Sequence, residues 1–151
     1  MNKYKIALLV LISMSLGIII GGYLFAQSQP RSLLAINRCQ NCLSHADLLG
    51  LVASVGIQKF PGLIPLVVLE TDKTVVIKHP FASERIDYLI FPKKDIKNIG
   101  EISESNSGYF IDMYLVARRI IEEEKLSKYM LYTNGPGYQD VTYLHFHLEA
   151  D

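Results

Sequence analysis

Two histidines stand on alternate positions near the carboxyl end of the sequence, in the stretch TYLHFHL from Thr142 to Leu148. In a β-strand, side chains two residues apart project from the same face, so His145 and His147 would point the same way as Tyr143. A neutral imidazole nitrogen can attack phosphorus near neutral pH, and a protonated imidazole can stabilise charge on phosphate oxygens. The spacing therefore favours phosphoryl chemistry, although the same three residues would also suit the solvated face of an edge strand.

A glycine-rich segment, NGPGYQ, directly precedes this stretch. Gly135 and Gly137 would let the backbone approach a ligand closely, and the amides of such a turn can point at an anion. The turn and the histidines together predict an anion pocket.

The segment NGPGYQDVTYLHFHL resembles the signature of the histidine-triad (HIT) superfamily, in which Asn-Gly, a glycine-containing loop and Gln-x-Val precede alternating histidines. Upstream, TVVIKHP and YLIFPKKDI are similar to the family's strand, proline-containing loop and Pro-Lys-Lys succession, so the resemblance spans roughly residues 66–148. The resemblance implies that His145 attacks the α-phosphorus of a nucleotide and that His147 contacts phosphate oxygens. It implies that Gln139 and Asn134 hold the phosphate and the leaving group. We accordingly assign His145, His147 and Gln139 to catalysis, and Asn134, Gly135, Gly137 and Tyr143 to nucleotide binding.

The same resemblance implies the fold, the substrates and the assembly. The family fold is an antiparallel sheet with helices, commonly in a homodimer, and its substrates are nucleoside phosphoramidates, dinucleoside polyphosphates and related nucleotide conjugates. The phosphoramidase branch needs no metal, so we assign neither a cofactor nor metal ligands. Because acidic and basic side chains balance at 15 each, the composition disfavours a nucleic-acid polymer as partner.

Three positions depart from the family pattern. Tyr143 stands where the first histidine of the triad would be, Asp140 where a small residue is frequent, and Asp87 near the place of another histidine. A tyrosine can donate or accept one hydrogen bond but cannot carry the charge of an imidazolium. Asp140 facing the pocket would repel a phosphate, or else raise the basicity of a neighbouring histidine. The alternative to an enzyme is therefore a nucleotide-binding or interaction module of the same fold with weakened chemistry.

The elements that must position these residues follow from the apolar pattern. Helical spacing predicts a short helix over residues 44–56 and a long one over residues 107–126, while β-branched and apolar runs predict strands. The predicted strands are LVVLE and TVVIKH as a hairpin, then YLIFP, KYMLYT and DVTYLHFHL. This order predicts an α+β domain with an antiparallel sheet of about five strands.

The N-terminal segment from Ile6 to Ala26 contains no charged residue and follows Lys3 and Lys5. As a helix it would just cross a hydrocarbon core about 30 Å thick. We interpret residues 1–27 as a single-pass anchor with the C-terminal domain outside the cytoplasm, and a cleaved export signal is the alternative. Residues 28–32 then form a tether, and residues 33–151 the folded HIT-like domain.

The two cysteines, Cys39 and Cys42, form CQNC and precede His45. Zinc binding and a redox role are the minority interpretations, because outside the cytoplasm such a pair is more often oxidised or structural. His79, before Pro80, is interpreted as the end of a strand. Lys93 and Lys94 are interpreted as a solvated pair rather than an anion site.

Overall fold

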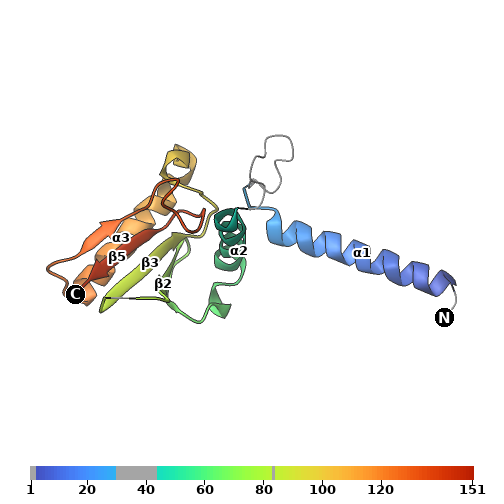
Figure 1. Cartoon of the computed structure of the whole chain (residues 1–151), viewed down its shortest axis with the longest axis horizontal. Helices are drawn as coiled ribbons and strands as arrows, with labels where there is room; N and C mark the ends of the chain where they lie inside the picture. The colour runs from blue at the N-terminus through green and yellow to red at the C-terminus, as the bar shows by residue number, and fades with distance from the viewer. Residues whose placement is uncertain (1–2, 30–43, 83) are drawn as a thin grey trace.

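The computed structural model describes residues 3–29, 44–82 and 84–151 of the chain (Figure 1). The CQNC motif and the predicted start of the domain at residue 33 lie outside these ranges, so the domain boundaries and the state of the cysteines stay predictions.

The described domain is built on a sheet in which all paired strands are antiparallel. Its strands are β1 (Val67–Glu70), β2 (Thr74–Lys78), β3 (Ile86–Pro92), β4 (Met130–Tyr132) and β5 (Phe146–Ala150). Their order in the sheet is β1-β2-β3-β5-β4, so the carboxyl-terminal strand β5 lies between β3 and β4. This arrangement confirms the predicted α+β class and the antiparallel sheet of five strands.

Helices cover both faces of this sheet (Figure 1). The apolar side of α3 (Ser107–Glu123) packs on one face, where Met113, Val116, Ala117 and Ile120 join Val76, Ile90, Phe146 and Leu148 in one buried cluster. The helix α2 (His45–Lys59) covers part of the other face, where Ile57 packs with Val75, Phe91 and Tyr143. Val75 and Val76 are neighbours on β2. Because successive strand residues point to opposite faces, Val76 belongs to the cluster under α3 and Val75 to the cluster under α2. Short 3₁₀ helices at Pro61–Leu63, Ile99–Glu101 and Glu104–Asn106 connect these elements.

The predicted last strand is longer than the observed one, since β5 begins only at Phe146 rather than near Asp140. The backbone before β5 makes its hydrogen bonds outside the sheet. The amide of Thr142 donates to the carbonyl of Ala46 at 3.0 Å, and the amide of Leu144 donates to the carbonyl of Ile96 at 2.7 Å. These bonds fasten the approach to β5 against the start of α2 and the loop after β3. The histidines therefore straddle the entry into the strand.

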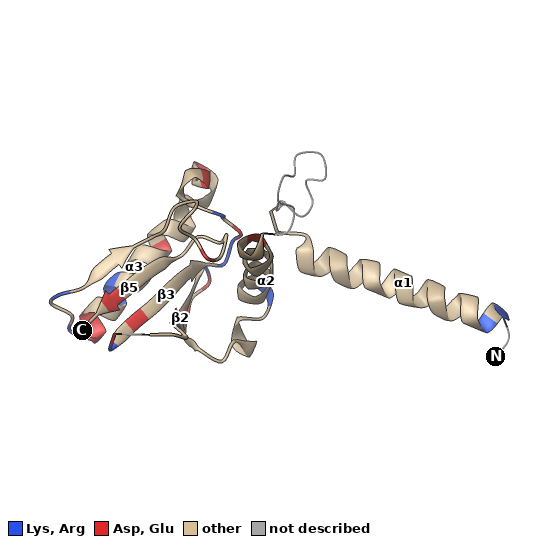
Figure 2. Ribbon diagram, in the orientation of Figure 1, with Lys and Arg blue, Asp and Glu red and all other residues tan. Residues whose placement is uncertain are grey.

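The N-terminal helix α1 (Lys3–Phe25) projects away from the domain (Figure 1). At about 1.5 Å per residue it is roughly 34 Å long, and it is apolar enough to cross a membrane, although a signal sequence has the same character. Figure 2 shows its positive charge gathered at the N-terminal end. Just after the helix, the amide of Gln29 donates to the Asp95 carboxylate at 2.6 Å, and the Gln29 side chain donates to the Asp95 carbonyl at 2.8 Å.

Candidate functional site

His145 lies just before β5 and is only 8 % exposed. Its Nδ1 is 2.7 Å from the carbonyl oxygen of Tyr143. Because a carbonyl can only accept, Nδ1 must carry the hydrogen and Nε2 must carry the lone pair. Burial lowers the pKa of His145 from 6.5 to about 4, with the hydrogen bond to Tyr143 opposing and the nearby His147 and His79 adding to the shift. The ring is therefore neutral at pH 7, with a defined free nitrogen.

His147, on β5, lies beside His145, with ring centroids 4.8 Å apart. The ring of Tyr132 on the neighbouring strand β4 stacks on His147 at 4.8 Å with an interplanar angle of 4°. His147 is half-buried, and burial lowers its pKa, while Glu149 and Asp140 oppose the shift. Strand pairing and ring stacking thus fix the imidazole next to that of His145.

A third imidazole, that of His79, joins this group from the end of β2, 6.4 Å from the ring of His147. Its Nδ1 is 3.2 Å from a carboxylate oxygen of Asp87, close enough for an ion pair when His79 is protonated, although the geometry is not that of a hydrogen bond. From the sequence, His79 was predicted only as the end of a strand. The register could have found it, because β2 and β5 both pair with β3, which carries Asp87.

Tyr143 shares the side of the sheet on which His145 lies, and both rings contact Phe91. Its own ring is fully buried, however, and its hydroxyl donates to the carbonyl of Pro92 at the end of β3. The hydroxyl is therefore occupied in holding the entry to β5 against β3.

Gln139 and Gly137 lie at a separate cavity of about 300 Å³, together with Lys97, Asn98 and Thr142. The Gln139 side chain donates to the carbonyl of Lys97 at 3.0 Å, and no histidine is among the described residues that line this cavity. Gly137 has a φ of 90°, a conformation that favours glycine. The structure thus brings His145 and His147 together but places Gln139 and Gly137 at another opening.

Asn134 and Gly135 lie in the loop that leaves β4 just beyond Tyr132. Since Tyr132 pairs with His147 across the sheet, this loop starts beside the histidines. The carbonyl of Gly135 accepts a hydrogen bond from the amide of Tyr138 at 3.1 Å, which closes the turn. Asp140, farther along the same segment, is close enough for its charge to oppose the lowering of the pKa of both His145 and His147.

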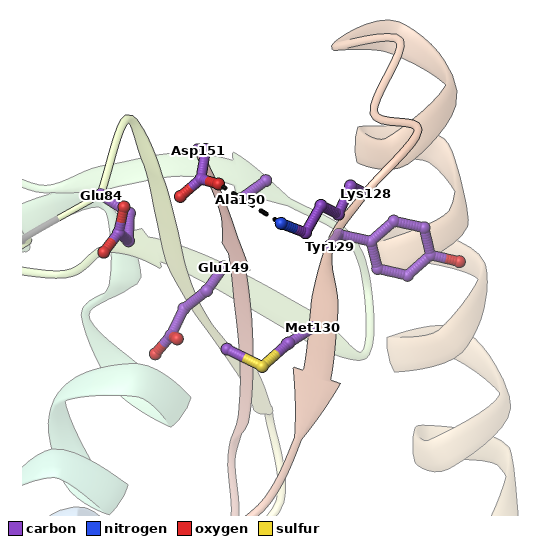
Figure 3. A pocket seen from close by; sticks show the side chains of 7 residues that line it. All are labelled: Glu84, Lys128, Tyr129, Met130, Glu149, Ala150 and Asp151. Atoms are coloured by element: carbon purple, nitrogen blue, oxygen red, sulfur yellow. Dashed lines mark ion pairs between the residues drawn. The ribbon is translucent and has the colours of Figure 1, made fainter.

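At the far end of β5 a cavity of about 320 Å³ is lined by acidic side chains. Figure 3 shows Glu84, Glu149 and Asp151 around it, with Lys128 directed at Asp151 at 4.0 Å. Glu149 connects this cavity with the histidine cluster. Its carboxylate accepts a hydrogen bond at 2.5 Å from the hydroxyl of Tyr132, whose ring stacks on His147. That bond, more than burial or charge, raises the pKa of Tyr132 to about 12.

Together these groups form a half-buried cluster of three imidazoles, flanked by aromatic rings and bordered by carboxylates. A neutral, oriented imidazole with a free nitrogen is suited to attack an electrophilic centre such as phosphorus.

Comparison with known proteins identifies relatives of this chain. The family model described as "Scavenger mRNA decapping enzyme C-term binding" matches residues 64–150. An uncharacterised HIT-like protein of Buchnera aphidicola subsp. Baizongia pistaciae is 30% identical over 94 residues, which cover 58% of this chain and 82% of that protein.

Solved structures of HIT family proteins resemble about two thirds of this chain. A HIT family hydrolase from Clostridium thermocellum is 30% identical with a TM-score of 0.58, over 66% of this chain and 89% of that one. A HIT family hydrolase from Legionella pneumophila is 27% identical with a TM-score of 0.56, over 62% of this chain and 88% of that one. The sequence motif, the fold and these relatives agree, and the chain belongs to the histidine-triad superfamily.

Proposed function

We propose that this protein is a HIT-type hydrolase or transferase that cleaves a phosphoanhydride or phosphoramidate bond at the α-phosphate of a nucleotide, with His145 as the nucleophile. The observation that carries the proposal is the state of His145. Its Nδ1–H is held by the Tyr143 carbonyl, and burial keeps the ring neutral, so that Nε2 keeps its lone pair at pH 7.

In the proposed first step, Nε2 of His145 forms a bond to the α-phosphorus while the bond from phosphorus to the leaving group breaks. The departing amine or phosphate takes up a proton, and the positive charge that develops on His145 is shared with the Tyr143 carbonyl through Nδ1–H. Water, or an acceptor hydroxyl, then attacks phosphorus and releases the neutral imidazole with the loss of a proton. The product of hydrolysis is a nucleoside monophosphate.

His147 is proposed to contact the phosphate oxygens. Its ring is 4.8 Å from that of His145 and is held by stacking on Tyr132, so it is positioned before a ligand arrives. Because burial lowers the pKa of His147, its ring is mainly neutral at pH 7 when no ligand is bound. The negative charge of a bound phosphate would favour the protonated ring.

The test uses the full chain in detergent micelles with adenosine phosphoramidate and diadenosine polyphosphates. A capped dinucleotide completes the panel, since the matching family is named after a decapping enzyme. We expect release of AMP, or of the corresponding nucleoside monophosphate, that His145→Ala abolishes and His45→Ala, at the exposed start of α2, leaves unchanged. Mass spectrometry of acid-quenched wild-type protein should detect a nucleotidyl adduct. Absence of turnover on every substrate would reject the enzymatic assignment.

The alternative function is a nucleotide-binding or interaction module without turnover. The buried Tyr143 favours it, because its hydroxyl is engaged by Pro92 and the first triad position contributes no imidazole. Nucleotide binding measured by calorimetry, with no turnover in either wild type or Tyr143→His, would support the module over the enzyme.

We also propose that α1 anchors the protein in a membrane with the domain outside the cytoplasm, in agreement with the two lysines at its N-terminal end. A homodimer is proposed from membership of the superfamily. Chemical crosslinking of the full chain in micelles tests the dimer, and accessibility of the domain to protease in intact cells tests the orientation.

A further inference from the structure

A second feature of the site is a group of ligand atoms on β3 and β5. Asp87, His147 and Glu149 each direct one ligand atom, a carboxylate oxygen or a ring nitrogen, to within 4.8 Å of the other two. Asp87 and Glu149 face each other across the antiparallel pair, a position where like charges are destabilising. Something of positive charge between them would remove that repulsion.

Asp87 provides an independent indication, because it is only 5 % exposed and one of its carboxylate oxygens, Oδ1, has no hydrogen-bond partner among the described residues. The buried Nε2 of His147 likewise has none. A buried acceptor left without a partner destabilises the fold, and more so when it is charged. His79 contacts only the other oxygen, Oδ2, of Asp87.

We propose that Asp87, His147 and Glu149 form a binding site for one divalent transition-metal ion. Two carboxylates and one imidazole suit Mn²⁺, Fe²⁺ or Zn²⁺ better than Mg²⁺ or Ca²⁺, which prefer sets made only of oxygen ligands. The remaining coordination positions would be filled by water or by a ligand.

The site needs little rearrangement to close around an ion. Ligand atoms about 2.1 Å from a tetrahedral metal are about 3.4 Å apart, so the 4.8 Å limit requires a movement of about 1.4 Å at most. Glu149 can supply it by turning its half-buried side chain. Because its Oε1 accepts from the Tyr132 hydroxyl, the second oxygen remains for the ion, and Tyr132 serves as an outer partner that orients the carboxylate.

The surroundings favour a cation as well. Glu84 and Asp151 line the cavity next to Glu149, and Lys128 is the basic residue among its described lining residues (Figure 3).

An ion on His147 would lie next to the ring of His145 and would bring positive charge to the place where an anionic nucleotide is proposed to bind. That consequence rests on the proposed function. Binding of the ion does not, because it is measured without a nucleotide and His145→Ala should leave it intact.

The experiment uses the full chain in detergent micelles with Cys39→Ser and Cys42→Ser, so that the thiols do not contribute a second zinc site. After treatment with a chelator, the protein is titrated with MnCl₂ and with ZnCl₂ by calorimetry, and bound metal is counted by mass spectrometry after desalting. We expect one ion per chain, and affinity weakened about tenfold or more in Glu149→Gln and in Asp87→Asn.

Glu84→Gln is the matched control, because it removes an exposed carboxylate from the same edge without removing a proposed ligand. It should change the affinity less than about twofold, in contrast to the roughly tenfold effect of losing a ligand. Circular dichroism establishes that each variant is folded, and Glu149→Gln decides the result if the buried Asp87→Asn does not fold. The proposal is overturned if neither metal binds at one ion per chain, or if Glu84→Gln weakens binding as much as Glu149→Gln, since the acidic edge would then attract cations only diffusely.

Discussion

Replacing His145 by glutamine should remove most of the acid sensitivity of the folded domain between pH 6.5 and about 4. In the native protein burial lowers the pKa of His145 from 6.5 to about 4, whereas in the unfolded chain the ring protonates near its ordinary value. Between these two pH values the unfolded state binds more protons. The free energy of unfolding therefore falls as the pH falls through this window and is unaffected by this group above it.

The size of the effect follows from the two pKa values. At about 1.4 kcal/mol for each factor of ten, the change from 6.5 to about 4 corresponds to about 3 kcal/mol. The native ring is only 8 % exposed, so solvent screens this contribution little. His147, whose pKa is also lowered, leaves a smaller residual dependence in the variant.

The assay is urea unfolding of the full chain in micelles at several pH values from 7.5 to 4, followed by tyrosine fluorescence, since the chain has nine tyrosines and no tryptophan. Wild type, His145→Gln and the control His45→Gln are compared by their slopes with pH, so that the fixed cost of each substitution cancels. The control should keep the wild-type slope. Burial does not lower the pKa of His145 if His145→Gln loses stability with acid as steeply as wild type, or if nuclear magnetic resonance places the His145 titration near 6.5.

Three further predictions concern the supports of the site and the anchor. Tyr143→Phe should lower the free energy of unfolding by about 1–3 kcal/mol in urea titrations, because the buried Pro92 carbonyl loses its donor; an unchanged midpoint would contradict this. Gly50→Ala should destabilise the domain by about 1–3 kcal/mol, since the new Cβ would lie 2.5 Å from Oγ1 and 2.7 Å from the carbonyl oxygen of Thr142. Gly56→Ala is the control and should cause no steric clash, because the nearest atom to its Cβ would be 3.9 Å away. The full-mass protein should stay in the membrane pellet after alkaline carbonate extraction, and a shorter released product would instead indicate signal cleavage.

Much of the fold could be predicted from the sequence, because hydrophobic periodicity determined the elements. The hairpin of β1 and β2, the apolar strand β3 and the amphipathic helix α3 all have patterns that burial alone explains. The start of β5 could not be predicted in this way. The stretch before it alternates like a strand, but its amides bond to Ala46 and Ile96, which are distant in sequence.

The site was less accessible to sequence reasoning. The two-residue period of a strand predicted that the rings of His145 and His147 lie together, as they do. The position of His79 beside them depends instead on the order of β2, β3 and β5 in the sheet. The tyrosine at the first triad position could be read as a site residue from its place in the motif. Its hydroxyl instead reaches the end of β3, a contact that only the packed structure reveals.

The two hydrogen bonds between Gln29 and Asp95 have a consequence for where the proposed substrates would be encountered. Gln29 lies four residues beyond the end of α1 at Phe25. With α1 across a bilayer, these two hydrogen bonds would therefore keep the domain close to the lipid head groups. Nucleotide polyphosphates are depleted next to anionic lipids within about a Debye length. Turnover in vesicles should then rise with ionic strength and with the share of neutral lipid, a dependence that a freely diffusing relative would not have.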